Sequence, residues 1–169
     1  MRVLVSAASR HGATAEIAAV IAATLREAGH TPVVLAPAAV TGLDGFDAAV
    51  IGSGIYAGHW LSSAKDLLND HREALALMPV WLFSSGPIGD PPKPVGDPVD
   101  AEPLVRLVGA REHRVFAGEL VRSRLGLAER TITAVVRAPE GDYRDWAAIE
   151  AWSQEIAAAI TPAATGTHR

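Results

Sequence analysis

The chain has 169 residues, of which 49% are hydrophobic and 20% are charged, and this balance suits one globular domain with a single core. The formal net charge of −4 argues against a general nucleic-acid binder, which would normally present a basic face. The sequence contains no cysteine, which excludes disulfides, iron–sulfur clusters, thiolate zinc sites and cysteine nucleophiles.

The first half of the chain alternates short apolar runs with segments of helical spacing. The N-terminal run, MRVLVSAAS, is too short and too soon polar for a signal peptide, so we expect it to form a strand. Apolar residues recur at helical spacing from Ile17 to Ala28, and Gly29 ends that pattern. In this half we predict strands at 2–6, 31–35 and 48–53 and helices at about 17–28 and 61–77.

The second half continues the alternation but contains two irregular segments. Residues 86–100 are rich in proline and glycine, which predicts a long loop. Residues 124–137 combine helical spacing with β-branched residues, and we favour a helix there. The remaining predicted elements are strands at 79–84 and 113–120, a short helix at 101–108, and a last helix that begins near Asp142 as its N-cap. We expect residues 1–160 to form a single domain and residues 161–169 a disordered tail.

The sequence offers no candidate transmembrane segment. Its longest uncharged stretch, residues 48–64, falls short of the roughly 20 apolar residues that a membrane span needs, and it includes three glycines and a histidine. We therefore expect a soluble, cytoplasmic protein, with peripheral membrane contact left open.

Strands that alternate with helices predict an α/β fold, with a parallel sheet covered by helices on both faces. Ligands of such sheets bind beyond the carboxyl ends of the strands, where the strand order reverses. The loops that follow the first, third, fourth and fifth predicted strands are therefore the places where a binding site is expected.

The first of these loops is Ser9 to Thr14, with the sequence SRHGAT. It offers two hydroxyls, a glycine and a series of backbone N–H groups at a helix N-terminus, which together favour a phosphate group. It is not a nucleoside-triphosphate loop, because no Gly-Lys-Ser/Thr sequence follows. The alternative is a plain helix cap made by the Ser9 hydroxyl.

The second loop is the stretch IGSGIYAGHW at residues 51–60. Its glycine spacing is GxGxxxG and it follows the third strand, so it does not match the GxGxxG dinucleotide fingerprint of a first strand–helix junction. The aromatic residues Tyr56, His59 and Trp60 beside pliable glycines suit a planar ring. The alternative is a glycine-rich turn whose Tyr and Trp fill the core.

The third loop is SSGPIGD, from Ser84 to Asp90, where small residues let the backbone approach a ligand closely. By itself it also fits an ordinary surface turn.

Taken together, the first loop suits a phosphate, the second suits a flat ring and the third closes the far side of the site. This combination describes flavin mononucleotide (FMN) better than a dinucleotide.

Three segments carry a resemblance to a known family: VLVSAASRHGATAEIA, DAAVIGSGIYAGHWLSSAKDLL and VWLFSSGPIGDPP, with RAPEGDYRDWAAIEAW near the C-terminus. They resemble the flavodoxin-like FMN-binding proteins, and most of all the branch of menaquinone-dependent protoporphyrinogen oxidase and its flavodoxin-domain relatives. The resemblance covers most of residues 2–160. It implies a three-layer α/β sandwich around a five-stranded parallel sheet of order 2-1-3-4-5.

The resemblance also implies which residues would contact FMN. Backbone between Gly54 and Gly58 would lie near flavin N5, where a glycine peptide can turn to accept a bond from the reduced ring, and Tyr56 or Trp60 would stack on the ring. The cofactor-binding residues expected in this way are Ser9, Arg10, His11, Gly12, Ala13, Thr14, Ser53, Gly54, Ile55, Tyr56, Gly58, His59, Trp60, Ser85, Gly86, Pro87 and Gly89.

The chain departs from the electron-carrying flavodoxins in three ways. Arg10 and His11 replace small or hydroxylated residues of the first loop, although a basic group beside a phosphate is chemically reasonable. The chain is only mildly acidic, and GSGIYAGHW replaces the short acidic loop of the carriers. The mild acidity and the replaced loop both favour the oxidase-like branch.

Three classes of function remain open. The preferred one is a flavin-dependent oxidoreductase that exchanges two electrons with a quinone or a porphyrinogen-type substrate. The flavin would carry the chemistry, so no catalytic side chain is required, with His59 as a candidate proton relay. The others are an FMN electron carrier that docks on redox partner proteins and a flavodoxin fold that has lost its flavin.

The anionic groups of a porphyrinogen would need cationic partners. Five arginines of the second half are candidates, although a solvated face is the alternative: Arg106, Arg111, Arg114, Arg122 and Arg124. The six histidines lack metal-ligand spacing, so no metal site is expected. The expected partners are a small redox substrate or a redox protein, and the expected oligomeric state is a monomer or a homodimer.

Overall fold

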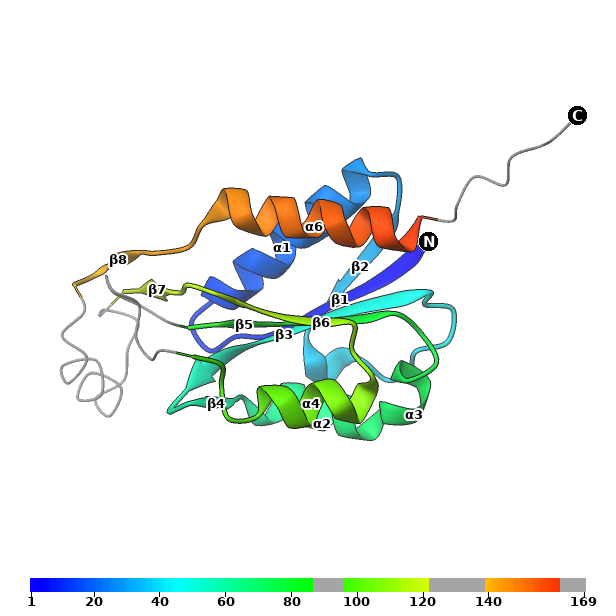
Figure 1. Ribbon diagram of the computed structural model, residues 1–169, viewed down its shortest axis with the longest axis horizontal. Helices are drawn as coiled ribbons and strands as arrows, with labels where there is room; N and C mark the ends of the chain where they lie inside the picture. The colour runs from blue at the N-terminus through cyan, green and yellow to red at the C-terminus, as the bar shows by residue number, and fades with distance from the viewer. Residues whose placement is uncertain (87–95, 122–138, 162–169) are drawn as a thin grey trace, which may run out of the picture.

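A computed structural model describes residues 1–86, 96–121 and 139–161 of the chain. These residues form a three-layer sandwich in which helices cover both faces of a central sheet (Figure 1). The elements in chain order are β1 (Arg2–Ala8), α1 (Ala13–Glu27), β2 (Thr31–Leu35), the 3-10 helix η1 (Pro37–Ala39), β3 (Ala48–Tyr56), β4 (His59–Trp60), α2 (Ser62–Asp70), α3 (Arg72–Leu75), β5 (Val80–Ser85), α4 (Ala101–Val108), β6 (Glu112–Phe116), β7 (Glu119–Leu120), β8 (Gly141–Asp142) and α6 (Trp146–Ile160).

The central sheet has the strand order β2-β1-β3-β5-β6, and all four of these pairings are parallel. Counted along the five parallel strands, this is the predicted order 2-1-3-4-5, so the predicted fold class is confirmed. The order reverses between β1 and β3, which places the carboxyl ends of these two strands beside the expected ligand site.

Two apolar cores lie on the two faces of the sheet. Along β1, Val3 and Val5 join the core beneath α1 and α6, whereas Leu4 and Ala8 join the core beneath α2 and α4. Both faces of the strand are therefore buried, as is typical of a parallel sheet. Figure 1 shows α1 and α6 on one side of the sheet and α2, α3 and α4 on the other.

Gly52, the first glycine of the stretch 51–60, is required by packing within the sheet. It lies opposite Phe83 on the neighbouring strand β5. A Cβ atom built on Gly52 would overlap the Phe83 ring, which in turn packs against Phe116 and Trp152. Gly52 is therefore needed for core packing, and the later glycines of the stretch, Gly54 and Gly58, are the candidates for the ligand site.

Three sequence predictions about individual elements were wrong. The predicted helix at 61–77 is broken at His71, whose φ of −111° and ψ of 15° separate α2 from α3. The predicted strand at 113–120 is split into β6 and β7. Asp145 rather than Asp142 caps the last helix by accepting a bond from the Ala148 amide at 3.0 Å, because Asp142 is engaged by Arg144.

Several predictions lie wholly or partly outside the described residues. These are most of the loop at 86–100, all of the helix at 124–137, and all but the first residue of the tail at 161–169. The short strand β4 is an addition that the sequence pattern did not predict, and it pairs antiparallel with the end of β3.

Candidate functional site at the carboxyl edge of the sheet

The loop from Ser9 to Gly12 leads from β1 directly into α1. Gly12 occupies the N-cap position with a φ of 95°, and no side chain in the described part of the chain caps the helix. The Ser9 Oγ accepts a hydrogen bond from the Gly12 amide at 3.0 Å, so it closes the loop and leaves the amides of the first helical turn without a side-chain cap. The plain-cap alternative is therefore wrong, and the helix N-terminus presents the arrangement that favours an anion.

The second glycine of the stretch 51–60 lies against the first loop. A Cβ atom built on Gly54 would lie 3.2 Å from the Thr14 Oγ1 and 3.4 Å from a ring carbon of Tyr56. Any larger side chain at Gly54 would therefore push against the start of α1. This close approach ties the end of β3 to the loop that follows β1.

Aromatic and cationic side chains join the same two loops. The Arg10 guanidinium carbon lies 4.3 Å from the centroid of the Tyr56 ring, which is cation–π geometry. The His11 and Tyr56 rings are 6.3 Å apart and inclined by 57°. The structure therefore brings together Arg10, His11, Thr14, Gly54 and Tyr56, which the sequence placed in two separate loops.

Residues 55–60 form a β-hairpin at this edge of the sheet. Tyr56 pairs with His59 across a two-residue turn, and the turn residues Ala57 and Gly58 have φ values of 50° and 82°. Positive φ at both positions is the signature of a type I′ turn. Opposite residues of a hairpin share a face, so Tyr56 and His59 lie on one face while Ile55 and Trp60 lie on the other.

Trp60 belongs to the protein core. Its side chain is buried, with only 2% of the residue exposed, and the indole Nε1 donates a hydrogen bond to the Ser84 Oγ at 2.7 Å. The core-filling alternative therefore holds for Trp60. Tyr56, which is half-buried beside Arg10, is the better placed of the two rings for stacking on a ligand.

Polar bonds hold the hairpin at its base and at its tip. The Ser53 Oγ donates to the Gly54 carbonyl at 2.8 Å and accepts from the Leu61 amide at 2.9 Å. The Gly58 carbonyl accepts a bond from the Val99 amide at 3.0 Å. These bonds fix both the base and the tip of the hairpin.

Asp100 connects the hairpin to the start of α4. Its carboxylate accepts a bond from the Trp60 amide at 2.9 Å, lies 3.2 Å from the His59 Nδ1 and lies 3.5 Å from the Lys65 Nζ. Burial raises the pKa of Asp100, but the bonds from His59 and Trp60 and the charge of Lys65 outweigh it and leave the pKa below its usual value. The side chain of His59, the candidate proton relay, is 52% exposed and faces this carboxylate.

A polar pair beneath the hairpin was missed by the sequence analysis. The His113 Nε2 lies 2.7 Å from the Ser84 Oγ. The Trp60 indole donates to the Ser84 Oγ, whose own proton and second lone pair allow it either to donate to the His113 Nε2 or to accept from it. Burial lowers the pKa of His113 and outweighs the charges of Asp97 and Glu112, which favours the neutral imidazole.

The first two residues of the third loop, Ser84 and Ser85, are buried at the end of β5, and Gly86 follows them. A Cβ atom on Gly86 would lie 2.9 Å from the Ile55 Cβ, and one on Gly118 would lie 3.2 Å from the Gly86 Cα. The end of β3 and the chain segments after β5 and β6 therefore converge, and Gly118 joins the predicted residues. The predicted residues Pro87 and Gly89 lie outside the described part of the chain.

Three of the five candidate substrate-binding arginines are used elsewhere. Arg106 pairs with Glu102 on α4 and Arg114 pairs with Glu112 on β6. The Arg111 guanidinium lies over the Trp81 ring, and the Arg111 backbone amide donates a hydrogen bond to the Val80 carbonyl. Val80 is the first residue of β5, so Arg111 lies away from the carboxyl edge of the sheet. Arg122 and Arg124 fall outside the described residues.

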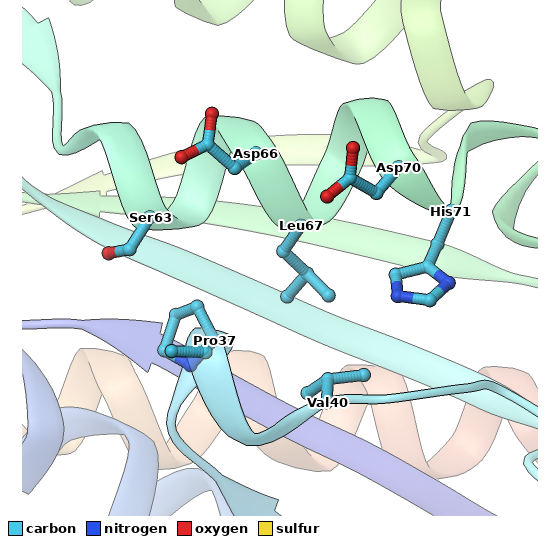
Figure 2. Close-up of a pocket in the computed structure, with 8 residues that line it drawn as sticks. Pro37, Val40, Ser63, Asp66, Leu67, Asp70 and His71 are labelled. Carbon is cyan, nitrogen blue, oxygen red and sulfur yellow. The ribbon is translucent and has the colours of Figure 1, made fainter.

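A hollow of about 200 Å³ lies between η1 and α2 and includes no residue of the three loops (Figure 2). Figure 2 shows Leu67 and His71 directed toward Val40, while the carboxylates of Asp66 and Asp70 point away from it. The residues that line the hollow are Pro37, Ala38, Val40, Ser63, Asp66, Leu67, Asp70 and His71.

Within residues 1–86, 96–121 and 139–161, no three His, Cys, Asp or Glu side chains gather closely enough to hold a metal ion. No helix of these segments is long and apolar enough to span a membrane.

Comparison with known proteins places this arrangement in a family. The family model described as "Flavodoxin domain" matches residues 4–146. The chain belongs to the flavodoxin domain family. No curated protein matches the sequence.

Solved structures share the fold at low sequence identity. A point mutant of the flavodoxin from Pseudomonas aeruginosa, with serine in place of a cysteine, is 20% identical with a TM-score of 0.64, and the match covers 95% of this chain and 99% of that one. The Streptococcus pneumoniae flavodoxin is 20% identical with a TM-score of 0.60 and coverages of 94% and 99%. The Flv1 flavodiiron core from Synechocystis is 15% identical with a TM-score of 0.66, and the match covers 95% of this chain and 36% of that one.

Flavodoxins bind FMN, so FMN is the cofactor that membership of the family assigns to this chain. The residues present fit it. The amides of the first turn of α1 suit the phosphate. Gly54 and Gly86 leave no room for a side chain, because a Cβ atom at Gly54 would contact Thr14 and one at Gly86 would contact Ile55. The Tyr56 ring lies beside both Arg10 and Gly54.

Proposed function

We propose that the chain binds FMN at the carboxyl edge of its sheet and transfers electrons between that flavin and a redox partner protein. The observation that carries this proposal is the contact between the first two loops. Arg10 lies on the Tyr56 ring, and Thr14 lies against Gly54, so residues that suit a phosphate adjoin residues that suit a planar ring.

In this proposal each loop has a separate task. The loop Ser9–Thr14 holds the phosphate through its amides and hydroxyls, with the Arg10 charge nearby. Gly54 and the hairpin at residues 55–60 provide backbone and the Tyr56 ring at the flavin, and Ser85 and Gly86 lie on the opposite side. FMN, when bound, supplies the electron chemistry, so the chain needs no catalytic side chain.

A partner protein is favoured because the flavodoxin fold also occurs inside larger redox proteins. The match to the rubredoxin oxygen:oxidoreductase of Desulfovibrio gigas covers 94% of this chain but 36% of that protein, at 15% identity and a TM-score of 0.63. In that protein the fold is one part of a longer chain. We propose that this chain meets its partner at the same edge that holds the flavin.

A second candidate is a two-electron oxidoreductase for a quinone or a porphyrinogen-type substrate. The basic Arg10 and His11 beside Tyr56 favour it, because they would suit an anionic substrate at the flavin edge. The pair formed by His59 and Asp100 would supply a proton at the hairpin. The engagement of Arg106, Arg111 and Arg114 elsewhere weighs against their predicted role in this candidate.

Two steps test the proposal. The purified protein is incubated with FMN, desalted and examined for retained flavin absorption, and a colourless product would leave only a flavin-free module. The loaded protein is then titrated with reductant while electrons are counted, and assayed with cytochrome c and with menadione. One-electron steps with rapid cytochrome c reduction support the carrier, whereas two-electron turnover confined to menadione supports the second candidate.

A further inference from the structure

Arg144, immediately after β8, is a buried guanidinium surrounded by carboxylates. Its side chain is 3% exposed. It makes two hydrogen bonds to the Asp142 carboxylate, at 2.7 and 2.8 Å, and one to the Glu16 Oε2 at 2.7 Å. The Glu119 carboxylate lies 3.7 Å away, and the Trp146 ring lies 4.4 Å from the guanidinium carbon.

This guanidinium is attached to the first turn of α1. Besides binding Glu16, it donates a bond to the Ala13 carbonyl at 3.1 Å. Ala13 is the first residue of α1, so the contact lies directly behind the amides proposed to bind phosphate. In Figure 1 the strands β7 and β8 lie at this same end of the molecule, beside the N-terminal end of α1.

The charges at this turn conflict with phosphate binding unless they are balanced. Glu16 is the acidic residue of the first turn. A carboxylate there competes with a phosphate for the positive end of the helix and repels it. Arg144 binds that carboxylate directly and so offsets its charge while fixing its position. The bonds to Asp142 keep the guanidinium in place and raise the pKa of Arg144, so it stays charged.

We propose that Arg144 is a positioning residue for the FMN phosphate, acting through Glu16 and the first turn of α1. Its role is to offset part of the Glu16 charge and to fix the position of that carboxylate, so that the loop prefers FMN to riboflavin, which lacks the phosphate. This inference rests on the proposed binding of FMN at Ser9–Thr14. It extends that proposal by naming a residue 128 positions from Glu16 that sets the preference for a phosphorylated flavin.

The experiment measures dissociation constants for FMN and for riboflavin by quenching of flavin fluorescence, on protein freed of flavin. The variants are Arg144→Gln, Glu16→Gln and the double variant. In Arg144→Gln we expect the ratio of the riboflavin to the FMN constant to fall about fivefold or more, within the range of charge effects at helix ends. In the double variant the ratio should recover, because the uncompensated charge is gone. In Glu16→Gln the ratio should rise.

A matched control is available on the edge strand β6. Arg114 also lies over a tryptophan ring, Trp152 at 5.7 Å, and pairs with Glu112 and Glu155. Arg114→Gln therefore removes a similar cluster away from the loop and should leave the ratio unchanged. The loss in Arg144→Gln should also shrink at about 1 M salt, because screening acts on charge and not on packing.

The outcomes separate this inference from the proposed function. Wild-type protein that binds neither flavin contradicts the proposed function itself. Wild-type preference for FMN that survives in Arg144→Gln, or that is lost and not restored in the double variant, contradicts the role of Arg144 alone. Where Arg144→Gln does not fold, Arg144→Lys serves instead. It retains the charge and should keep the ratio, and a Lys variant without FMN preference would overturn the inference.

Discussion

The two loops that meet at Tyr56 are built in opposite ways. The hairpin at residues 55–60 is held by bonds from Asp100 and Val99, by the buried indole of Trp60, and by the Ser53 bonds to the flanking residues Gly54 and Leu61. The loop Ser9–Gly12 is closed by the bond from the Gly12 amide to the Ser9 Oγ and leads into a helix whose first turn has no side-chain cap in the described part of the chain. The hairpin is therefore held rigidly by the protein itself, whereas the first turn of α1 has amides that suit a ligand. Changes in the hairpin should cost stability, and changes in the loop should mainly cost ligand affinity.

The largest expected loss of stability comes from Trp60→Ala. It removes a buried indole and its bond to Ser84, and we expect the free energy of unfolding to fall by about 3–5 kcal/mol. Tyr56→Ala is the matched change on the half-buried face of the same hairpin, and it should lower the free energy of unfolding much less. Urea denaturation of both variants measures the difference, and equal losses would contradict the assignment of Trp60 to the core.

The next largest loss is expected from Gly52→Ala. The added methyl group would overlap the Phe83 ring, which is packed against Trp152, so the strands must shift at a cost of about 1–3 kcal/mol. Gly42→Ala is the control, because nothing lies within 4 Å of a Cβ atom at that position. Thermal unfolding followed by circular dichroism compares the two, and a Gly52→Ala variant as stable as Gly42→Ala would show that this glycine does not serve packing.

A smaller, pH-dependent loss is expected from Asp100→Asn. The pKa of Asp100 lies below its usual 3.8, so its charged form stabilises the fold above that pH, and the stabilisation disappears as the pH falls through the folded-state pKa. We expect the variant to lose about 1–2 kcal/mol near pH 7, and the difference from wild type to shrink below about pH 4. The exposed Glu102→Gln on α4 is the control. A difference that stays constant down to low pH would rule out a contribution from the Asp100 charge.

The smallest loss of stability and a clear loss of affinity are expected from Ser9→Ala. It removes one bond to the Gly12 amide, which should cost about 0.5–1 kcal/mol of stability. The loop then loses its closed form, and FMN should bind several times more weakly while riboflavin is less affected. Fluorescence titration with both flavins tests this, and an equal loss for the two would place the effect away from the phosphate.

The parallel sheet was predictable because its strands are continuous apolar runs, such as Ala48–Ser53, that end at glycines or small polar residues. The meeting of the first and second loops was predictable in outline, since both follow strands that flank the reversal of strand order. The hairpin was not, because its second strand has two residues and its turn places a non-glycine residue, Ala57, at positive φ.

Contacts between distant residues were also hidden from the sequence. Arg144 and Glu16 are 128 positions apart, and each alone looks like a charged surface residue. His113 and Ser84 lie on neighbouring strands but 29 positions apart. No periodicity or spacing rule reports such pairs, because they depend on how the strands align and on which side chains the packing buries.

The account depends most on the claim that the two contrasting loops form one site for FMN. Isothermal titration of flavin-free protein with FMN tests this claim directly. We predict one FMN per chain, with an affinity that is higher than that for riboflavin and that falls in Ser9→Ala. An absence of heat and of any retained flavin, from protein shown to be folded by circular dichroism, would contradict it.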